Sequence, residues 1–148
     1  WLNENIITLS FFSASSNSLN GNNIKLSERL FLPSKKLRGF ESGKIGPKDN
    51  SDFIGGNYSM AINASSTLPQ VLPSLQNSDF IMFFDAGNIW GVDYDETIDD
   101  DNKIRSSVGI GVNINTVIGP LSFSLAQPIT KGKNDITETF RFNLGTTF

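Results

Sequence analysis

The chain has 148 residues, a net charge of -3 and a sequence pI near 4.8, so it offers no basic field for a nucleic-acid backbone. It contains neither Cys nor His, which excludes disulfides, thiolate and imidazole metal sites, Cys nucleophiles and Ser-His triads. We therefore expect no catalytic residues, no metal, no cofactor and no nucleic-acid partner.

Apolar residues recur with a period of two along almost the whole chain, which is the spacing of strands with one apolar face. In chain order, the predicted strands cover residues 5–16, 55–68, 79–91, 105–116, 120–128 and 137–148. In the fourth, Val108, Ile110, Val112 and Ile114 alternate with Gly and Asn. A turn at residues 118–120 leads into the fifth strand as a hairpin. The sequence therefore predicts an all-β fold of six antiparallel strands.

Two architectures suit these strands, a soluble β-sandwich and part of a transmembrane β-barrel. A soluble sandwich covers its outside with charges, whereas here the face opposite the apolar one is mostly Gly, Ser, Ala, Asn and Thr. The strands reach about ten residues, the length that spans a bilayer when tilted. Short turns alternate with long polar loops such as residues 91–103, as they do in outer-membrane barrels. The barrel is favoured, and the β-sandwich remains the alternative.

The number of strands adds a constraint on a membrane barrel. The smallest such barrels have about eight strands, and an open sheet edge cannot remain in lipid. The sequence also begins at Trp1 without an initiator Met. We therefore expect residues 1–148 to be the C-terminal part of a larger barrel that ends at Phe148, and we expect this piece not to fold alone.

Four stretches, taken in order, resemble one family of outer-membrane proteins. They are LRGFESGKIGPK (37–48), IGGNYSMAINAS (54–65), FFDAGNIW (83–90) and IGPLSFSLAQPI…TFRFNLGTTF (118–148). They resemble the C-terminal barrel of the bacterial surface antigen family over roughly the whole chain. Arg-Gly-Phe followed by Ile-Gly-Pro resembles the assembly-factor branch of the family more than the two-partner secretion transporters, which share the Arg-Gly-Phe or Arg-Gly-Tyr core.

The resemblance implies a sixteen-stranded barrel preceded by periplasmic POTRA domains. This chain would hold the last six strands, and the POTRA domains and the first ten strands would be absent from it. Residues 18–53 would form the sixth extracellular loop, which in the family folds back into the barrel lumen. The motif residues of this loop are Arg38, Gly39, Phe40, Ile45, Gly46 and Pro47.

Asp85 is the residue that we expect Arg38 to contact on the barrel wall. It is the only charged residue on its face of the predicted strand 79–91, apart from the strand's first residue. If the other face meets lipid, an Arg–carboxylate pair would satisfy both buried charges. The family commonly has a lumen-facing Glu where Ser65 stands here, so only one carboxylate is expected for Arg38. The alternatives are a solvated Arg38 and an Asp85 that contacts only water.

The last predicted strand carries a second candidate site. Phe140, Phe142, Leu144 and Phe148 resemble the terminal β-signal of outer-membrane proteins, in which alternate apolar residues end in an aromatic. In the family, the last strand pairs weakly with the first to form a lateral gate. Gly145 would loosen or kink that pairing, because Gly weakens strand interiors. A Gly packed under a neighbouring aromatic ring is an equal alternative.

The resemblance implies an assembly factor that is not an enzyme. It would insert and fold β-barrel proteins in the bacterial outer membrane through the lateral gate. Its implied partners are outer-membrane lipids, unfolded outer-membrane proteins and the accessory lipoproteins of an assembly complex. Two alternatives remain open, a two-partner-type polypeptide secretion channel and a barrel fused to a lipolytic enzyme domain.

Overall fold

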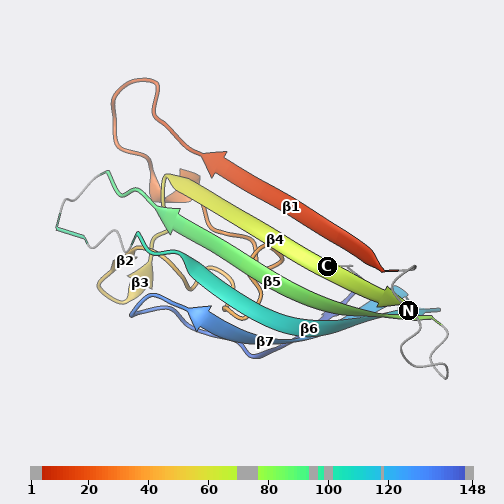
Figure 1. Cartoon of the computed structure of the whole chain (residues 1–148). Coiled ribbons are helices and arrows are strands. Elements are labelled where there is room, and N and C mark those ends of the chain that lie inside the picture. The colour runs from red at the N-terminus through yellow and green to blue at the C-terminus, as the bar shows by residue number, and fades with distance from the viewer. Residues whose placement is uncertain (1–4, 70–76, 94–96, 99–101, 118, 146–148) are drawn as a thin grey trace.

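The computed structural model describes residues 5–69, 77–93, 97–98, 102–117 and 119–145. Six strands form one antiparallel sheet in the order β1-β4-β5-β6-β7-β8 (Figure 1). Their bounds are β1 Ile6–Ser15, β4 Tyr58–Pro69, β5 Ser78–Trp90, β6 Arg105–Thr116, β7 Gly119–Thr130 and β8 Phe140–Leu144. The prediction of six antiparallel strands is therefore confirmed.

The connection between β1 and β4 is the longest in the described chain. It contains a 3-10 turn, η1 (Leu26–Glu28), and a small hairpin of β2 (Lys48–Asp49) and β3 (Asp52–Phe53). No helix in the described ranges is long and apolar enough to cross a membrane.

The start of the last strand was predicted incorrectly. Residue 137 was expected to begin this strand, but β8 begins at Phe140. The reason is that residues 136–138 pair with the long loop, through an isolated bridge between Phe40 and Thr137. Gly145 follows β8 with a φ of 81°, and its amide still donates to the Pro120 carbonyl at 2.8 Å. Phe148 lies outside the described residues.

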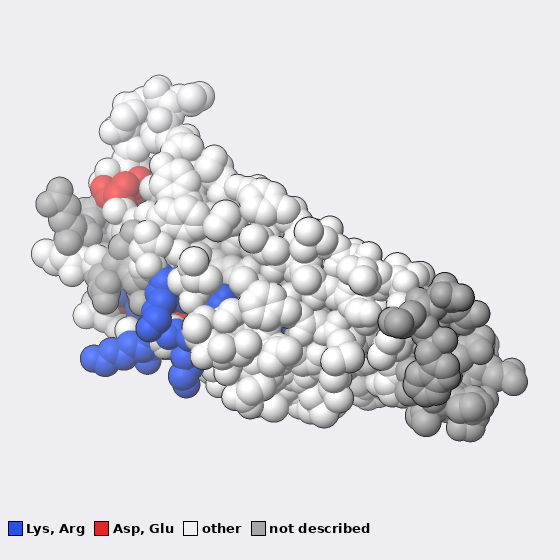
Figure 2. Space-filling model, viewed as in Figure 1, with Lys and Arg blue, Asp and Glu red and all other residues white. Residues whose placement is uncertain are grey.

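One face of the sheet is apolar and exposed. Its large exposed side chains on the strands include Ile7, Leu9, Phe11, Ile62, Met82, Phe84, Val108, Ile110, Leu125, Phe140, Phe142 and Leu144. Figure 2 shows that charged side chains gather toward the end of the molecule with the long loops, while the strand surface in view is uncharged. An apolar band of this kind is typical of a lipid-facing barrel wall.

The long loop covers the opposite, concave face of the sheet, where it lies behind the strands in Figure 1. The hydrophobic core lies between this loop and the sheet. Its buried members are Leu32, Leu37, Phe40 and Ile45 from the loop and Ala61 and Ile89 from the wall, with Phe12 packed beside them. The molecule therefore has its core between one sheet and a loop, unlike the two facing sheets of a β-sandwich.

Small residues on the concave face make room for larger neighbours. Phe83 on β5 lies opposite Gly109 on β6. A Cβ atom added to Gly109 would lie 2.4 Å from the Phe83 ring and 2.3 Å from the Leu125 carbonyl oxygen. Gly109 therefore lets the Phe83 ring lie across the neighbouring strand, which matters for the site described below.

We predict that Gly109→Ala destabilises the barrel by about 1–3 kcal/mol or more, because the added methyl group meets a backbone oxygen that cannot move easily. Gly111→Ala is the matched control on the same face of β6, since its nearest atom would be the Phe123 carbonyl oxygen at 3.2 Å. Urea unfolding of the full-length gene product in lipid vesicles measures both. Equal losses in the two variants would contradict the packing assigned to Phe83.

Candidate functional site

Arg38, near the tip of the loop, forms a buried ion pair with Asp85 on β5. The Arg38 Nε atom donates to Asp85 Oδ2 at 2.7 Å, and Nη2 donates to Oδ1 at 2.7 Å. The Arg38 backbone amide also donates to Oδ2, at 3.0 Å. The Asp85 side chain is completely buried. The structure thus brings the loop motif and its expected wall partner together in a two-pronged contact, the strongest geometry for such pairs.

Asn63 on β4 is a further partner of Asp85. It lies directly across from Asp85 in the β4–β5 register, and its Nδ2 atom donates to Asp85 Oδ1 at 2.9 Å. The same amide group donates to the Lys36 carbonyl of the loop at 2.8 Å. Ser65, where the family commonly has a Glu, lies opposite Phe83 instead. The neutral Asn63 amide therefore donates to the Asp85 carboxylate alongside Arg38, and it adds no second carboxylate to the site.

Phe83 supports the guanidinium of Arg38 from one side. The Arg38 Cζ atom lies 3.5 Å from the centre of the Phe83 ring. A planar guanidinium can stack on a ring and at the same time donate two parallel hydrogen bonds to a carboxylate, a geometry that a lysine ammonium does not provide. Phe83 reaches this position because Gly109 leaves space beside it. The site therefore depends on an aromatic–glycine pair in the wall as well as on the two charges.

Gly39 lets the loop backbone approach the wall. Its φ is 91°, and an added Cβ would lie 3.1 Å from the Ser107 Cβ and 3.2 Å from the Ala126 Cβ. The Ser107 hydroxyl donates to the carbonyl of Arg38. A positive φ and a close backbone approach both favour Gly at this position. The loop is consequently attached to β6 through the Arg38 carbonyl and to β5 through both the amide and the side chain of Arg38.

The other motif residues pack rather than pair. Phe40 is buried in the core between loop and wall, together with Ile45. Gly46 has a φ of 92° and lies against Ile89 of β5, and Pro47 is fully buried. Arg38, Gly39, Phe40, Ile45 and Gly46 thus contact the concave face or pack in the core beside it, and Pro47 is buried.

A second buried ion pair joins the β7–β8 connection to the wall, and sequence reasoning missed it. Arg105, at the start of β6, donates from Nε to Asp135 Oδ2 at 2.9 Å, and both side chains are completely buried. Arg105 also donates to Asn88 Oδ1 at 2.7 Å, and Asp135 accepts from the amide of Gly46 at 3.4 Å. Asp135 therefore holds the Ile-Gly-Pro part of the loop as well as its own connection.

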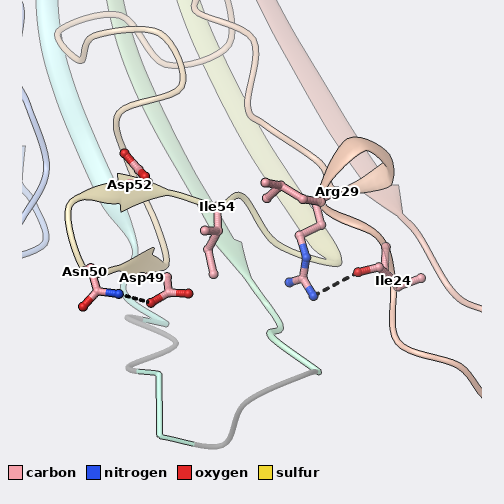
Figure 3. A pocket seen from close by; sticks show the side chains of 7 residues that line it. Ile24, Arg29, Asp49, Asn50, Asp52 and Ile54 are labelled. Atoms are coloured by element: carbon pink, nitrogen blue, oxygen red, sulfur yellow. Dashed lines mark hydrogen bonds between the residues drawn. The ribbon is translucent and has the colours of Figure 1, made fainter.

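A third ion pair lies at the end of the sheet that carries the long loops. Arg29 pairs with Asp93, the Nη2–Oδ1 distance being 2.5 Å, and the Ile24 amide donates to Asp93 Oδ2 at 2.9 Å. Figure 3 shows Arg29 and Ile24 beside a pocket that Asp49, Asn50, Asp52 and Ile54 also line. This contact fastens the start of the long loop to the β5–β6 connection.

Burial alone would raise the pKa of Asp93, but its hydrogen bonds and the nearby Arg29 charge outweigh burial. The donors are the Ile24 amide and the side chains of Asn57 and Arg29. The net result is a pKa below the usual 3.8 of an aspartate. The ionised form is therefore the form that the folded loops favour.

The terminal-strand residues lie as the period-two pattern predicts. Phe140, Phe142 and Leu144 are exposed on the outer face, and the rings of Phe142 and Phe123 lie 5.1 Å apart. Between them, Arg141 and Asn143 are more buried and occupy the inner positions. The five residues of β8 pair with Leu121–Leu125 of β7, and one further backbone hydrogen bond continues the pairing at each end. The described part of this strand thus has an apolar outer face and a short ladder.

An apolar, outward-facing sheet with a polar inner face and a loop fixed inside by a buried ion pair defines the wall of a transmembrane β-barrel. The Omp85 superfamily domain matches residues 3–148 of the chain. The chain belongs to the Omp85 superfamily, and this places it in the bacterial outer membrane. The six strands do not close into a barrel by themselves.

Individual relatives agree with this assignment. The chain is 32% identical over 131 residues to the outer membrane protein assembly factor BamA of Neorickettsia risticii, a match that covers 86% of the chain and 18% of that protein. It is 30% identical to BamA of Neisseria meningitidis, with 76% and 17% covered. The sorting assembly machinery 50 kDa subunit of Saccharomyces cerevisiae is 31% identical, with 76% and 25% covered.

A solved structure has the same fold. It is the crystal structure of BamA from Haemophilus ducreyi lacking POTRA domains 1–3, with a TM-score of 0.79 and 29% identity. The match covers 93% of this chain and 30% of that one. The chain therefore spans less than a fifth of the length of the two bacterial relatives above, and less than a third of the solved chain.

We predict that Arg38→Ala and Asp85→Ala each destabilise the barrel by about 3–5 kcal/mol, because each leaves a buried charge without its partner. The double variant is expected to lose clearly less than the sum of the two. Urea unfolding of the full-length gene product in lipid vesicles gives the three values. Lys35→Ala, an exposed cation of the same loop, is the control and should change little. Strict additivity would rule out the pair.

We predict that the contribution of Asp93 to stability depends on pH. Because its folded pKa is lowered, the contribution is complete well above 3.8 and is lost as the pH falls through the folded value. Asp93→Ala should therefore cost up to about 1 kcal/mol near neutral pH, and the difference from wild type should shrink below 3.8. Urea unfolding followed by tryptophan fluorescence measures it. A difference that grows toward acid would contradict the assignment.

Proposed function

We propose that this chain is the C-terminal barrel part of an outer-membrane protein assembly factor, which inserts and folds β-barrel proteins in the bacterial outer membrane. The observation that carries the proposal is the docked loop, with Arg38 on Asp85, in a chain whose relatives are named as assembly factors. POTRA domains and ten further strands would precede residues 1–148. The chain is not an enzyme, and its work is mechanical.

Each part of the proposed machine has a physical role. The Arg38–Asp85 pair braces the loop inside the lumen, so that the wall around β4 to β6 keeps its curvature. β8 contributes one side of a lateral gate, because it is the edge strand of the described sheet and β7 is its one neighbour there. An incoming strand can bind at an open sheet edge through main-chain hydrogen bonds. Such pairing provides affinity and does not require a particular sequence. Gly145 follows β8 with a positive φ, and its amide still pairs with β7 at Pro120.

The proposed partners follow from these surfaces. Unfolded outer-membrane proteins would pair with the gate edge, and outer-membrane lipids would cover the apolar outer face that includes Phe140, Phe142 and Leu144. The accessory lipoproteins of an assembly complex are further proposed partners. Neither a cofactor nor a metal takes part in this work.

Reconstitution tests the proposal directly. The full-length gene product in lipid vesicles should speed the folding of an added, urea-denatured β-barrel protein by about tenfold or more over empty vesicles, as judged by the altered gel mobility of folded barrels. Arg38→Ala should lose most of this acceleration, and Lys35→Ala should keep it. Folding at the rate of empty vesicles would refute the proposal. Transfer of a soluble polypeptide into the vesicles without barrel folding would favour a secretion channel.

A further inference from the structure

We propose that Arg141 is a positioning residue that ties the docked loop to the last strand, so that the loop holds β8 in place from inside the barrel. Arg141 lies between Phe140 and Phe142, which face outward, and its side chain therefore points to the concave side. There Nη1 donates to the Ser34 carbonyl at 2.8 Å and Nη2 donates to the Phe40 carbonyl at 2.7 Å. One guanidinium thus bridges two loop carbonyls on either side of Arg38.

Glu138 fixes the direction in which this guanidinium points. Its Oε2 atom accepts from Arg141 Nε at 2.8 Å and also from Nη2. The Arg141 side chain is only 11% exposed, whereas that of Glu138 is 39% exposed. The pair is therefore half open to water on the Glu138 side, and the more deeply placed donors go to the loop. Glu138 therefore orients the Arg141 guanidinium, and the two loop carbonyls accept its hydrogen bonds.

The backbone before β8 reinforces the same link. The Glu138 amide donates to the Gly39 carbonyl at 3.0 Å, and the Glu41 amide donates to the Ile136 carbonyl at 2.9 Å. The Ile136 amide in turn donates to the Lys44 carbonyl at 3.0 Å. Residues 136–138 therefore pair with the loop tip in the manner of a short strand, and at Thr139 the chain passes to pairing with β7, where β8 follows.

Two independent anchors follow from this arrangement. Arg38 fastens the loop to the wall at Asp85, and Arg141 fastens the last strand to the loop. Loss of Arg141 should release β8 and leave the loop docked. The consequence for assembly rests on the proposed function, because only a gate-forming β8 would need its position set. The contact itself does not depend on that function.

Hydrogen–deuterium exchange on the full-length gene product in lipid vesicles tests the link. Arg141→Gln should speed exchange in residues 136–144 by about tenfold, because it removes charge-assisted hydrogen bonds to two carbonyls. Residues 80–90, which include Asp85, should exchange as in wild type. Arg141→Lys should restore only part of the protection, since one ammonium cannot bridge both carbonyls in the same geometry. Asn143→Ala, at the next inner position of β8, is the matched control and should match wild type.

Glu138→Gln provides a second, milder variant in case Arg141→Gln does not fold. It keeps both loop carbonyl contacts and should raise exchange in the same residues by a smaller factor. Unchanged exchange in residues 136–144 in both variants would overturn the proposal. So would an equal increase throughout the barrel, which would make Arg141 a general packing residue. Barrel-folding activity is measured in parallel. If the wild-type protein is inactive but the variants show the expected exchange pattern, the proposed function is refuted and the contact between Arg141 and the loop is supported.

Discussion

The burial of Asp85 is the constraint on which the rest of the structure depends. A carboxylate without solvent on the wall of a barrel is costly unless charged and polar donors surround it. Here it accepts from the Arg38 amide and guanidinium and from Asn63. Two of these three donor groups belong to the loop. The wall therefore reaches a satisfied state only when the loop is folded back onto it, and the loop position is a requirement rather than one choice among several.

The small side chains of the wall follow from the same constraint. A loop backbone can approach the sheet this closely only if the facing residues are small, as Ser107 and Ala126 are beneath Gly39. Gly109 serves the same end indirectly, because it admits the Phe83 ring on which the Arg38 guanidinium lies. The small side chains on the face opposite the apolar one, which favoured a barrel over a sandwich, thus have a second cause. In this part of the barrel, small residues are there to accommodate protein.

The sequence predicted what depends on local pattern and missed what depends on register. Period two placed all six strands, and Asp85 stood out as the charge in the middle of an otherwise uncharged face. Asn63 could not be chosen over Ser65 without the β4–β5 pairing, which sets it opposite Asp85. Arg105 and Asp135 are 30 residues apart, and no local pattern connects them. The start of β8 was misplaced because residues 136–138 pair with the loop, an interaction that strand periodicity does not reveal.

The five residues of β8 serve two environments, and this alternation fixes their register. Phe140, Phe142 and Leu144 face outward, while Arg141 reaches the loop. A slip of one residue would exchange the two sets, because side chains alternate across a sheet. It would place a guanidinium in lipid, at a cost of about 2–4 kcal/mol near the bilayer midplane, and would also break its bonds to the loop. The outward apolar side chains and the inward guanidinium thus act together to keep this short strand in one register.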